Sequence, residues 1–293
     1  MKNTIIYVLL FIFVFSFSSM SYEEKSKNNL PEQVSAYKDI SYASIEGFEQ
    51  NLTSLDIYKP DNQTNLPVLL FLHGGFWIQG DKGNYDYKTK AFIRENWMYI
   101  SANYRLAPEG AFPSNAEDVA NAIAWVYENI SDYGGNPNKI FLMGFSAGAH
   151  LAALVSTNEK YLLQHNLELD IIKAVVLLET AYYDIPRRVM TEPYEKMLHF
   201  MAFGEDIIDW YKASPIHHIE PSRYIPPSLI IHTETSERHH WQAVRLAEKL
   251  NKNGYIAQTY HADNLNHTEL TTELGKPGDK TIKRIFDFLN QYL

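Results

Sequence analysis

The sequence Gly144-Phe145-Ser146-Ala147-Gly148 decides how this chain is interpreted, because it joins a short apolar run to an alanine-rich stretch. Residues 140–143 have the composition of a buried strand, and residues 149–155 that of a buried helix. A serine flanked by glycines at such a strand–turn–helix junction is held in a strained turn, and its hydroxyl projects from the edge of a sheet. The small residues let the strand and the helix approach closely. The stretch therefore indicates a nucleophilic serine, Ser146.

Apolar runs alternate with helical periodicity along the rest of the chain. Runs that are apolar at every position are typical of strands buried on both faces. We predict strands at residues 54–58, 67–72, 98–102, 140–143, 172–178, 228–231 and 255–260, the first of them an edge strand, and helices at 88–95, 116–130, 241–253 and 281–293. This alternation predicts an α/β fold with a mostly parallel, doubly wound sheet.

Residues 184–227 interrupt the alternation. The segment is rich in tyrosine, methionine, tryptophan and proline, and it lies between the strands predicted at 172–178 and 228–231. Ligands of such sheets bind beyond the carboxyl ends of the strands, on the side where the serine turn lies. We therefore predict a small cap or lid at 184–227. The alternative is a surface crossover with no part in binding.

Length and composition narrow the class of protein. The chain has 293 residues, a formal net charge of −9 and no cysteine. Binding to nucleic-acid phosphates requires clustered lysine and arginine, which the sequence lacks, so no nucleic-acid partner is expected. The missing cysteines exclude disulfides, thiolate metal sites and a cysteine nucleophile. The length allows one large domain.

The amino-terminal residues have the pattern of a secretory signal peptide. Lys2 precedes an apolar run over residues 5–17, and small polar residues follow at 18–21. The run is short for a membrane anchor, although an uncleaved anchor is the alternative. We predict a signal peptide at 1–21, a lead-in segment at 22–39 and one domain at 40–293. The mature protein would be secreted or periplasmic, without membrane association.

A serine nucleophile needs a base, which in such a sheet is expected on the loop after the last strand. His267 fits this place, because it follows the strand predicted at 255–260 and a polar loop. His261 is the second candidate but would lie in the strand or at its end. The other histidines are expected to be packed or solvated. They include His239 and His240, which as neighbours on a helix point apart, so no metal site is predicted.

The negative charge that develops on a carbonyl oxygen under attack needs backbone N–H donors. The sequence His73-Gly74-Gly75-Phe76-Trp77 follows the strand predicted at 67–72. Its glycines would let the backbone approach a substrate carbonyl closely. We predict an oxyanion hole formed by the backbone of Gly74, Gly75 and Phe76, completed by the N–H of Ala147.

Four motifs together resemble α/β-hydrolase esterases, in order and in spacing. They are His73-Gly-Gly-Phe-Trp77, Asn103-Tyr-Arg-Leu-Ala-Pro-Glu109, Asp132-Tyr-Gly-Gly-Asn-Pro137 and Gly144-Phe-Ser-Ala-Gly148. The chain is most similar to the branch that contains hormone-sensitive-lipase-like carboxylesterases and bacterial kynurenine-formamidase-like enzymes, over about residues 40–293.

The resemblance implies roles for several residues. Ser146 would be the nucleophile and His267 the base, with oxyanion donors from the backbone of residues 74–76 and from Ala147. The segment 103–109 would form a tight loop whose Arg105 and Glu109 support the oxyanion loop. No cofactor is implied.

The chain departs from the family pattern at the acid of the triad. The family places Asp or Glu in a segment reading I-H-G-x-x-D after the penultimate strand. The corresponding segment here is Ile231-His-Thr-Glu-Thr-Ser-Glu237, in which the expected position falls on Ser236 or Thr235 and Thr233 replaces the glycine. Neither Ser236 nor Thr235 can stabilise an imidazolium by charge.

Three carboxylates could serve instead. Glu234 points to the same side as position 236 in an extended chain, so it is the predicted acid. Glu237 would need a kink and is the alternative. Asp184, after the preceding strand, is a third candidate.

These residues predict a serine hydrolase that cleaves a small carboxylic ester through an acyl-serine intermediate, with neither cofactor nor metal. One alternative is an arylformamidase or another amidase that uses the same site. The other is a catalytically weakened hydrolase scaffold used for binding, which the missing acid would favour.

Overall fold

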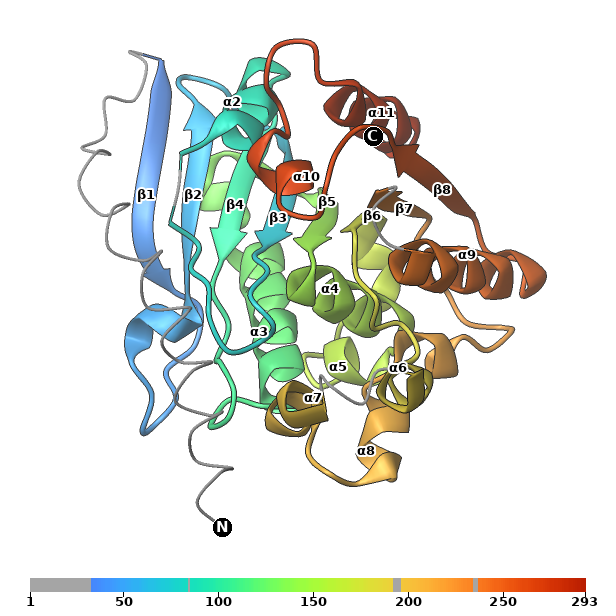
Figure 1. Cartoon of the computed structure of the whole chain (residues 1–293). Helices are drawn as coiled ribbons and strands as arrows, with labels where there is room; N and C mark the ends of the chain where they lie inside the picture. Colours follow the sequence, from blue (N-terminus) through green and yellow to red (C-terminus); the bar gives the residue numbers. More distant parts are fainter. Residues whose placement is uncertain (1–32, 84, 192–195, 234–236) are drawn as a thin grey trace, which may run out of the picture. The chain divides into compact units, whose positions relative to one another are not determined.

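An eight-stranded sheet organises the chain in the computed structural model, which describes residues 33–83, 85–191, 196–233 and 237–293 (Figure 1). The strands are ordered β1-β2-β4-β3-β5-β6-β7-β8. β1 runs antiparallel to β2 and β2 antiparallel to β4, and all other neighbouring pairs are parallel. The predicted mostly parallel, doubly wound sheet is confirmed.

The strands are β1 (Val34–Ser41), β2 (Ser54–Pro60), β3 (Leu66–Leu72), β4 (Met98–Ala102), β5 (Gly135–Phe145), β6 (Ile172–Leu178), β7 (Ser228–Thr233) and β8 (Ala257–Ala262). The α-helices are α2 (Tyr87–Arg94), α3 (Ser114–Asn129), α4 (Ala147–Thr157), α5 (Lys160–Leu163), α6 (Ile185–Thr191), α7 (Lys196–Phe203), α8 (Ile207–Lys212), α9 (Glu237–Lys252), α10 (Glu269–Thr272) and α11 (Lys280–Leu289).

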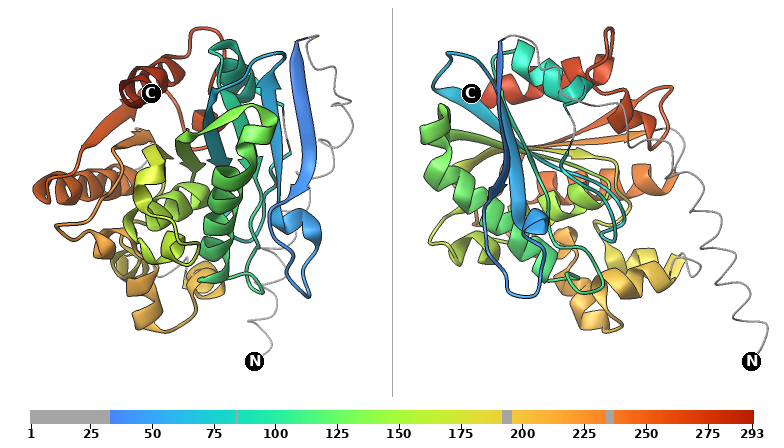
Figure 2. Two further views of the ribbon diagram at one scale, coloured as in Figure 1. Left: turned by 180° about the vertical axis from the view of Figure 1, so that it is seen from behind. Right: turned by 90° about the vertical axis from the view of Figure 1, so that its left-hand side faces the viewer.

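Helices cover both faces of the sheet (Figure 2). On one face α2 and α11 meet through Phe92 and Phe286, whose ring centroids lie 4.8 Å apart. α3 and α4 pack together against β5, and α9 packs on β7 and β8. Every residue of α4 is buried, because β5, β6 and α3 surround this helix. That explains its almost wholly apolar sequence.

Side chains mark several element boundaries. The carboxylate of Asp86 accepts a hydrogen bond from the Thr89 N–H at the start of α2. Asp279 accepts from the N–H groups of Thr281 and Ile282 at the start of α11. These are the cap interactions expected of aspartate, which satisfies N–H groups that have no partner inside the helix.

The parallel register brings the ends of the central strands together. Leu72 of β3 pairs with Gly144 of β5, and Gly144 pairs with Leu177 of β6. Leu178 of β6 pairs in turn with Ile231 of β7. The loops after β3, β5, β6 and β7 therefore leave the sheet along one edge, where ligands of such folds bind.

The amino-terminal boundary differs from the prediction. β1 begins at Val34, so the sheet includes residues that were predicted to belong to a lead-in ending at 39. β1, and not β2, is the edge strand. Its polar sequence gave no strand signal, because its side chains are only half-buried or exposed. The predicted signal peptide at 1–21 lies outside the described residues.

Between β6 and β7 the chain forms α6, α7 and α8, which lie below the arrowheads of β3 to β5 in Figure 1. This is the segment predicted as a cap. It is tied to the domain by the Phe112 N–H, which donates to the Ala202 carbonyl, and by the Ile216 N–H, which donates to the Tyr183 carbonyl.

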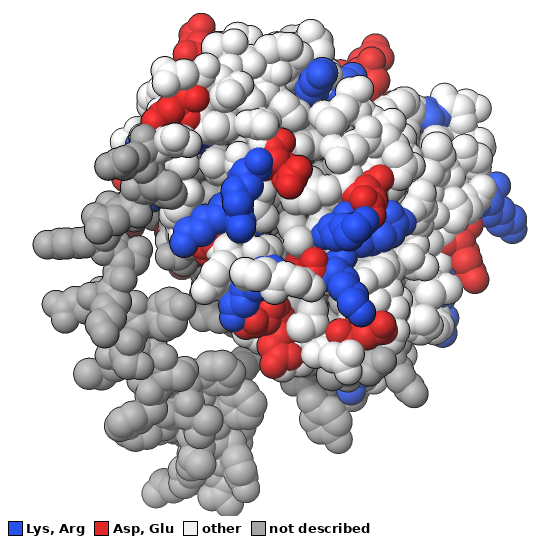
Figure 3. Space-filling model, turned by 90° about the horizontal axis from the view of Figure 1, so that it is seen from above, with Lys and Arg blue, Asp and Glu red and all other residues white. Residues whose placement is uncertain are grey.

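The surface and the helices carry two further observations. Basic and acidic side chains lie side by side on the face drawn in Figure 3. Among the described residues, no helix is both long and apolar enough to span a membrane.

Candidate active site

Ser146 occupies a strained turn between β5 and α4. Its backbone has φ 54° and ψ −115°, a conformation that costs a non-glycine residue about 1–3 kcal/mol. The Ser146 N–H donates to the Leu178 carbonyl at 2.8 Å, which fastens the turn to the end of β6. A Cβ on Gly144 would lie 2.2 Å from the Gly148 carbonyl oxygen, and a Cβ on Gly148 would lie 2.3 Å from that of Leu72. The prediction that small residues let the strand and the helix approach closely is confirmed at both positions.

His267 lies opposite the serine. Its Nε2 is 3.1 Å from the Ser146 Oγ, although the two residues are 121 positions apart. The loop after β8 holds it there, because the Asn266 side chain accepts hydrogen bonds from the N–H groups of Thr268 and Glu269. The imidazole also rests on the Phe145 ring at a centroid distance of 4.8 Å. His261 lies in β8, where it contacts Asp263.

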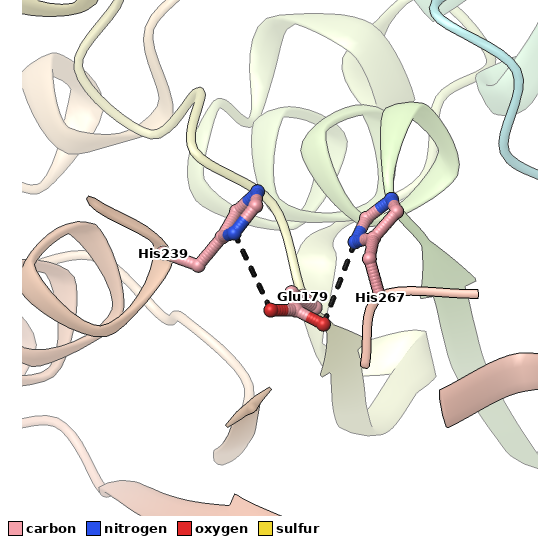
Figure 4. Close-up of side chains that lie close together, drawn as sticks. All are labelled: Glu179, His239 and His267. Carbon is pink, nitrogen blue, oxygen red and sulfur yellow. Dashed lines mark ion pairs between the residues drawn. The ribbon is translucent and has the colours of Figure 1, made fainter. Parts of the chain in front are cut away.

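The carboxylate at the far side of His267 belongs to Glu179, the first residue after β6 (Figure 4). Its Oε2 lies 3.4 Å from His267 Nδ1, which is an ion-pair distance and longer than a well-formed hydrogen bond. The Glu179 side chain is fully buried. Its Oε1 accepts a hydrogen bond from the Thr233 hydroxyl at 2.6 Å. Thr233 therefore positions the carboxylate.

The electrostatics favour an ionised Glu179. Burial raises the pKa of its carboxyl, but the contacts with His267 and Thr233 outweigh burial and hold the pKa below its usual value. A carboxylate only accepts hydrogen bonds, so the Nδ1 that faces it carries the proton. The Nε2 of His267 is then free to accept the proton of Ser146.

The acid was predicted in the loop after β7, whereas the structure places Glu179, from the end of β6, beside His267. Glu234 lies outside the described residues, and the side chain of Glu237 is not described. Asp184 lies apart from His267 and contacts His217 and Arg245. Among the described side chains, the carboxylate at His267 Nδ1 is that of Glu179. Because β6 lies directly beside β5, its first following residue reaches the histidine, and this strand order is not visible in the sequence.

The predicted oxyanion loop follows β3 and has an unusual backbone. Gly75 has φ +126°, and a Cβ there would lie 1.9 Å from the Gln79 carbonyl oxygen. Phe76 and Trp77 also have positive φ, 54° and 62°. Three successive residues of this kind turn the chain sharply, and both the Ile78 and Gln79 N–H groups donate to the Gly75 carbonyl. Ala147 begins α4, whose N-terminus favours negative charge.

Trp77 connects the oxyanion loop to the serine helix. Its indole Nε1–H donates to His150 Nδ1 at 3.2 Å, and His150 lies one turn after Ser146 on α4. The His150 Nε2 contacts the Ala213 carbonyl at 2.8 Å, so this imidazole is neutral with its proton on Nε2. The Trp77 ring also packs edge-on against Tyr182 and Phe203. The oxyanion loop, α4 and the segment after β6 are thereby fixed to one another.

This connection predicts an acid-sensitive stability. Burial lowers the pKa of His150 from 6.5 to about 4, so between these values the unfolded chain binds a proton that the folded protein does not. The stabilisation is complete above pH 6.5 and is lost as the pH falls. Between pH 7 and pH 5 the free energy of unfolding should therefore fall by about 2 kcal/mol less in His150→Gln than in the parent. Urea unfolding at the two pH values measures this difference, and equal pH dependence would contradict it.

The segment 103–109 supports the oxyanion loop, but through other residues than predicted. The Tyr104 hydroxyl donates to the His73 carbonyl at 2.8 Å, and its ring stacks on the His73 imidazole. The Ala107 N–H donates to the Trp77 carbonyl at 2.7 Å. Arg105 instead forms a buried ion pair with Asp118 of α3, at 2.7 Å, and Glu109 is exposed.

A second imidazole reaches the same carboxylate. His239, on α9, has its Nδ1 3.3 Å from Glu179 Oε1 and its ring parallel to that of His267 (Figure 4). His240 points elsewhere, to His232, as expected for adjacent residues on a helix. Burial lowers the pKa of His239 to about 4, so it is neutral at neutral pH. His239 could not be predicted as a site residue from the sequence, because its proximity to Glu179 depends on how α9 packs.

The sheet order, the strained serine turn and the position of His267 define the class of this protein as an α/β-hydrolase. The chain belongs to the BD-FAE family, because the family model matches residues 55–250. The resemblance to α/β-hydrolase esterases is thereby confirmed.

Curated relatives and solved structures agree with this class. The chain is 34% identical over 210 residues to the esterase LipQ of Mycobacterium tuberculosis, which covers 67% of this chain and 48% of LipQ. It is 31% identical over 206 residues to the probable carboxylic ester hydrolase LipM of the same organism, covering 66% of this chain and 46% of LipM. The chain thus spans about half the length of these relatives.

Among solved structures, esterase B from Lactobacillus rhamnosis matches with a TM-score of 0.77, covering 98% of this chain and 94% of the esterase. The two sequences are 17% identical, so this likeness shows the fold alone.

Proposed function

We propose that this protein is a carboxylesterase that cleaves small carboxylic esters through an acyl-serine intermediate. The observation that carries the proposal is the alignment of Ser146, His267 and Glu179, with 3.1 Å between Oγ and Nε2 and 3.4 Å between Nδ1 and Oε2. The similarity to LipQ, an esterase, and to LipM, a probable carboxylic ester hydrolase, supports the choice of substrate class. The sequence lacks an acid at the position that the family uses, and this favoured the alternative of a binding scaffold. Glu179 supplies a carboxylate from another loop.

The reaction begins with a proton transfer. His267 Nε2 takes the proton of the Ser146 hydroxyl while the oxygen attacks the ester carbonyl carbon. The imidazolium that forms lies beside the ionised carboxylate of Glu179, which stabilises it. The same Nε2–H then protonates the departing alcohol. A water molecule, activated by His267 as the base, then attacks the acyl-serine, and the carboxylic acid is released.

The negative charge on the tetrahedral oxygen requires donors fixed in advance. We assign this role to the backbone N–H groups of Gly74, Gly75, Phe76 and Ala147. One such donor contributes about 10²- to 10³-fold to kcat in a serine hydrolase. The hydrogen bonds of Trp77 and Tyr104 keep the loop in place, so its geometry does not depend on bound substrate.

A substitution at Glu179 tests the acid. Glu179→Gln keeps the size of the side chain but removes its charge, and an amide can face the Nδ1–H only with its oxygen. We expect kcat to fall by about 10⁴-fold, as when the acid of a serine-protease triad becomes its amide. Steady-state hydrolysis of a p-nitrophenyl ester measures the effect.

The matched controls are the carboxylates favoured by the sequence alone. Glu234→Gln, Glu237→Gln and Asp184→Asn should each retain kcat within about tenfold of the parent, a loss far below that of a triad acid. A 10⁴-fold loss in Glu234→Gln with an active Glu179→Gln would return the acid to the loop after β7.

The class of substrate is tested with a panel of p-nitrophenyl esters of increasing acyl length, phenolic esters and N-formyl-kynurenine. We expect turnover of the esters and much slower turnover of the formamide. A preference for N-formyl-kynurenine would instead identify an arylformamidase. No turnover of either class would support the binding scaffold.

Two further proposals concern a cap over the substrate and the export of the protein. We propose that α6, α7 and α8 form the cap over the substrate, since they follow β6 at the edge of the sheet where Ser146 lies. We also propose export of the protein with cleavage near residue 21, on the apolar run at 5–17. Amino-terminal sequencing of the mature protein tests the export, and an intact Met1 would contradict cleavage.

A further inference from the structure

The cluster formed by Glu179, His239 and His267 has the composition of a metal site. One ligand atom from each residue, a carboxylate oxygen and two imidazole nitrogens, lies within 4.8 Å of the others. Two imidazoles and a carboxylate are a ligand set that Zn²⁺ uses in proteins. The three residues come from the end of β6, from α9 and from the loop after β8, so only the fold brings them together.

The distances suit a tetrahedral ion. Zn²⁺ with bonds of about 2.0–2.1 Å to nitrogen and oxygen separates its ligand atoms by about 3.3 Å. His239 Nδ1 lies 3.3 Å from one carboxylate oxygen of Glu179, Oε1, and His267 Nδ1 lies 3.4 Å from the other, Oε2. The imidazole planes are within 9° of parallel, with centroids 5.3 Å apart, and both Nδ1 atoms point at the carboxylate (Figure 4). The ligand atoms lie within 4.8 Å of one another, so small side-chain rotations must bring them to about 3.3 Å for an ion to bind all three.

The cluster can also be reached by an ion. The Glu179 side chain is fully buried, but the side chains of His239 and His267 are 21% and 35% exposed. An ion entering between the imidazoles would meet the two ring nitrogens first and the carboxylate oxygens behind them. Imidazole nitrogens favour zinc and neighbouring transition metals, whereas Mg²⁺ and Ca²⁺ prefer oxygen ligands.

We propose that Glu179, His239 and His267 form a Zn²⁺ site through which the ion reversibly inhibits the enzyme. A bound ion occupies His267 Nδ1, so the ring proton moves to Nε2. The Nε2 then has no lone pair for the Ser146 proton, and Glu179 is engaged by the ion. His267 can then no longer accept the Ser146 proton, and Glu179 can no longer stabilise the imidazolium. The effect on turnover rests on the proposed function, whereas the binding of Zn²⁺ does not.

Isothermal titration calorimetry of Zn²⁺ into Ser146→Ala tests the site without any catalytic turnover. We expect one Zn²⁺ per chain, and no binding of Mg²⁺. His239→Gln should weaken the affinity at least about tenfold, because it removes one of three ligands. His240→Gln is the matched control, since this neighbour on α9 faces His232, and it should bind Zn²⁺ like the parent. Glu179→Gln gives a second ligand deletion with the same expected loss.

Inhibition of the parent enzyme is the second readout. Zn²⁺ should stop ester hydrolysis and a chelator should restore it, while His239→Gln should need at least about tenfold more Zn²⁺ for half-inhibition. Equal sensitivity of His239→Gln and the parent, or no Zn²⁺ binding to Ser146→Ala, would overturn the site. Zn²⁺ binding by a protein that hydrolyses no ester would instead contradict the proposed function and leave the metal site intact.

Discussion

Replacing Ser146 by alanine is expected to lower kcat for ester hydrolysis by about 10⁶-fold, the loss found when the nucleophile of a serine hydrolase is removed. The substitution deletes one oxygen atom and leaves the backbone of the turn, which Gly144 and Gly148 permit and the hydrogen bond to Leu178 holds. The loss should therefore appear in kcat and not in stability. Steady-state kinetics and thermal unfolding of the same preparation separate the two.

The residual activity is informative as well. The oxyanion donors and substrate binding remain in Ser146→Ala, and they still accelerate hydrolysis about 10³-fold over water. A variant that keeps a tenth or more of the parental kcat would mean that another residue performs the attack.

Replacing His267 by alanine is expected to cost about as much as removing the serine, about 10⁶-fold in kcat, because nucleophile and base act as one unit. Without the imidazole no group accepts the proton of Ser146, and the serine stays a weak nucleophile. The double variant Ser146→Ala/His267→Ala should be no slower than either single variant, since effects within one catalytic unit are not additive.

His261→Ala is the control for this prediction. His261 was the second candidate for the base, and it lies in β8, stacked on His232 and in contact with Asp263. Its removal should leave kcat within a fewfold of the parent. If His261→Ala lost the activity and His267→Ala kept it, the base would have to be reassigned.

Local sequence patterns sufficed to predict the strained turn at Ser146, the place of His267 after β8 and the close backbone of the glycine loop after β3. Ser146 follows a run of apolar residues and precedes a helix, and both neighbouring elements are encoded within a few positions of it. His267 could be predicted because the polar loop after the last strand has one histidine. The glycines at 74 and 75 indicated that the backbone can approach a substrate closely. The sequence did not show that Trp77 and Tyr104 support this loop.

The acid could not be predicted in the same way, because its place depends on the order of the strands. Glu179 directly follows the apolar run Ile172–Leu178, and this was the available signal: a carboxylate at the carboxyl end of a buried parallel strand. What the sequence does not contain is that β6 lies beside β5 and β7. Thr233, which replaces a glycine of the family pattern, is the residue whose hydroxyl donates a hydrogen bond to Glu179.

The edge strand β1 was missed for a different reason. Its side chains are half-buried or exposed, so the alternation that marks a strand is absent, although the Lys38 side chain contacts Tyr58 and Asp56 of β2. Hydrophobic periodicity reports burial, and it carries little information where burial is slight.

The central claim is that Ser146 attacks the substrate with His267 as its base, and covalent trapping tests it most directly. A p-nitrophenyl phosphonate should release one equivalent of p-nitrophenol per chain and inactivate the enzyme, and peptide mass spectrometry should locate the adduct on Ser146. Ser146→Ala should take up no label, and His267→Ala should react far more slowly than the parent. An adduct on any other residue, or an active enzyme that takes up no label, would contradict the account.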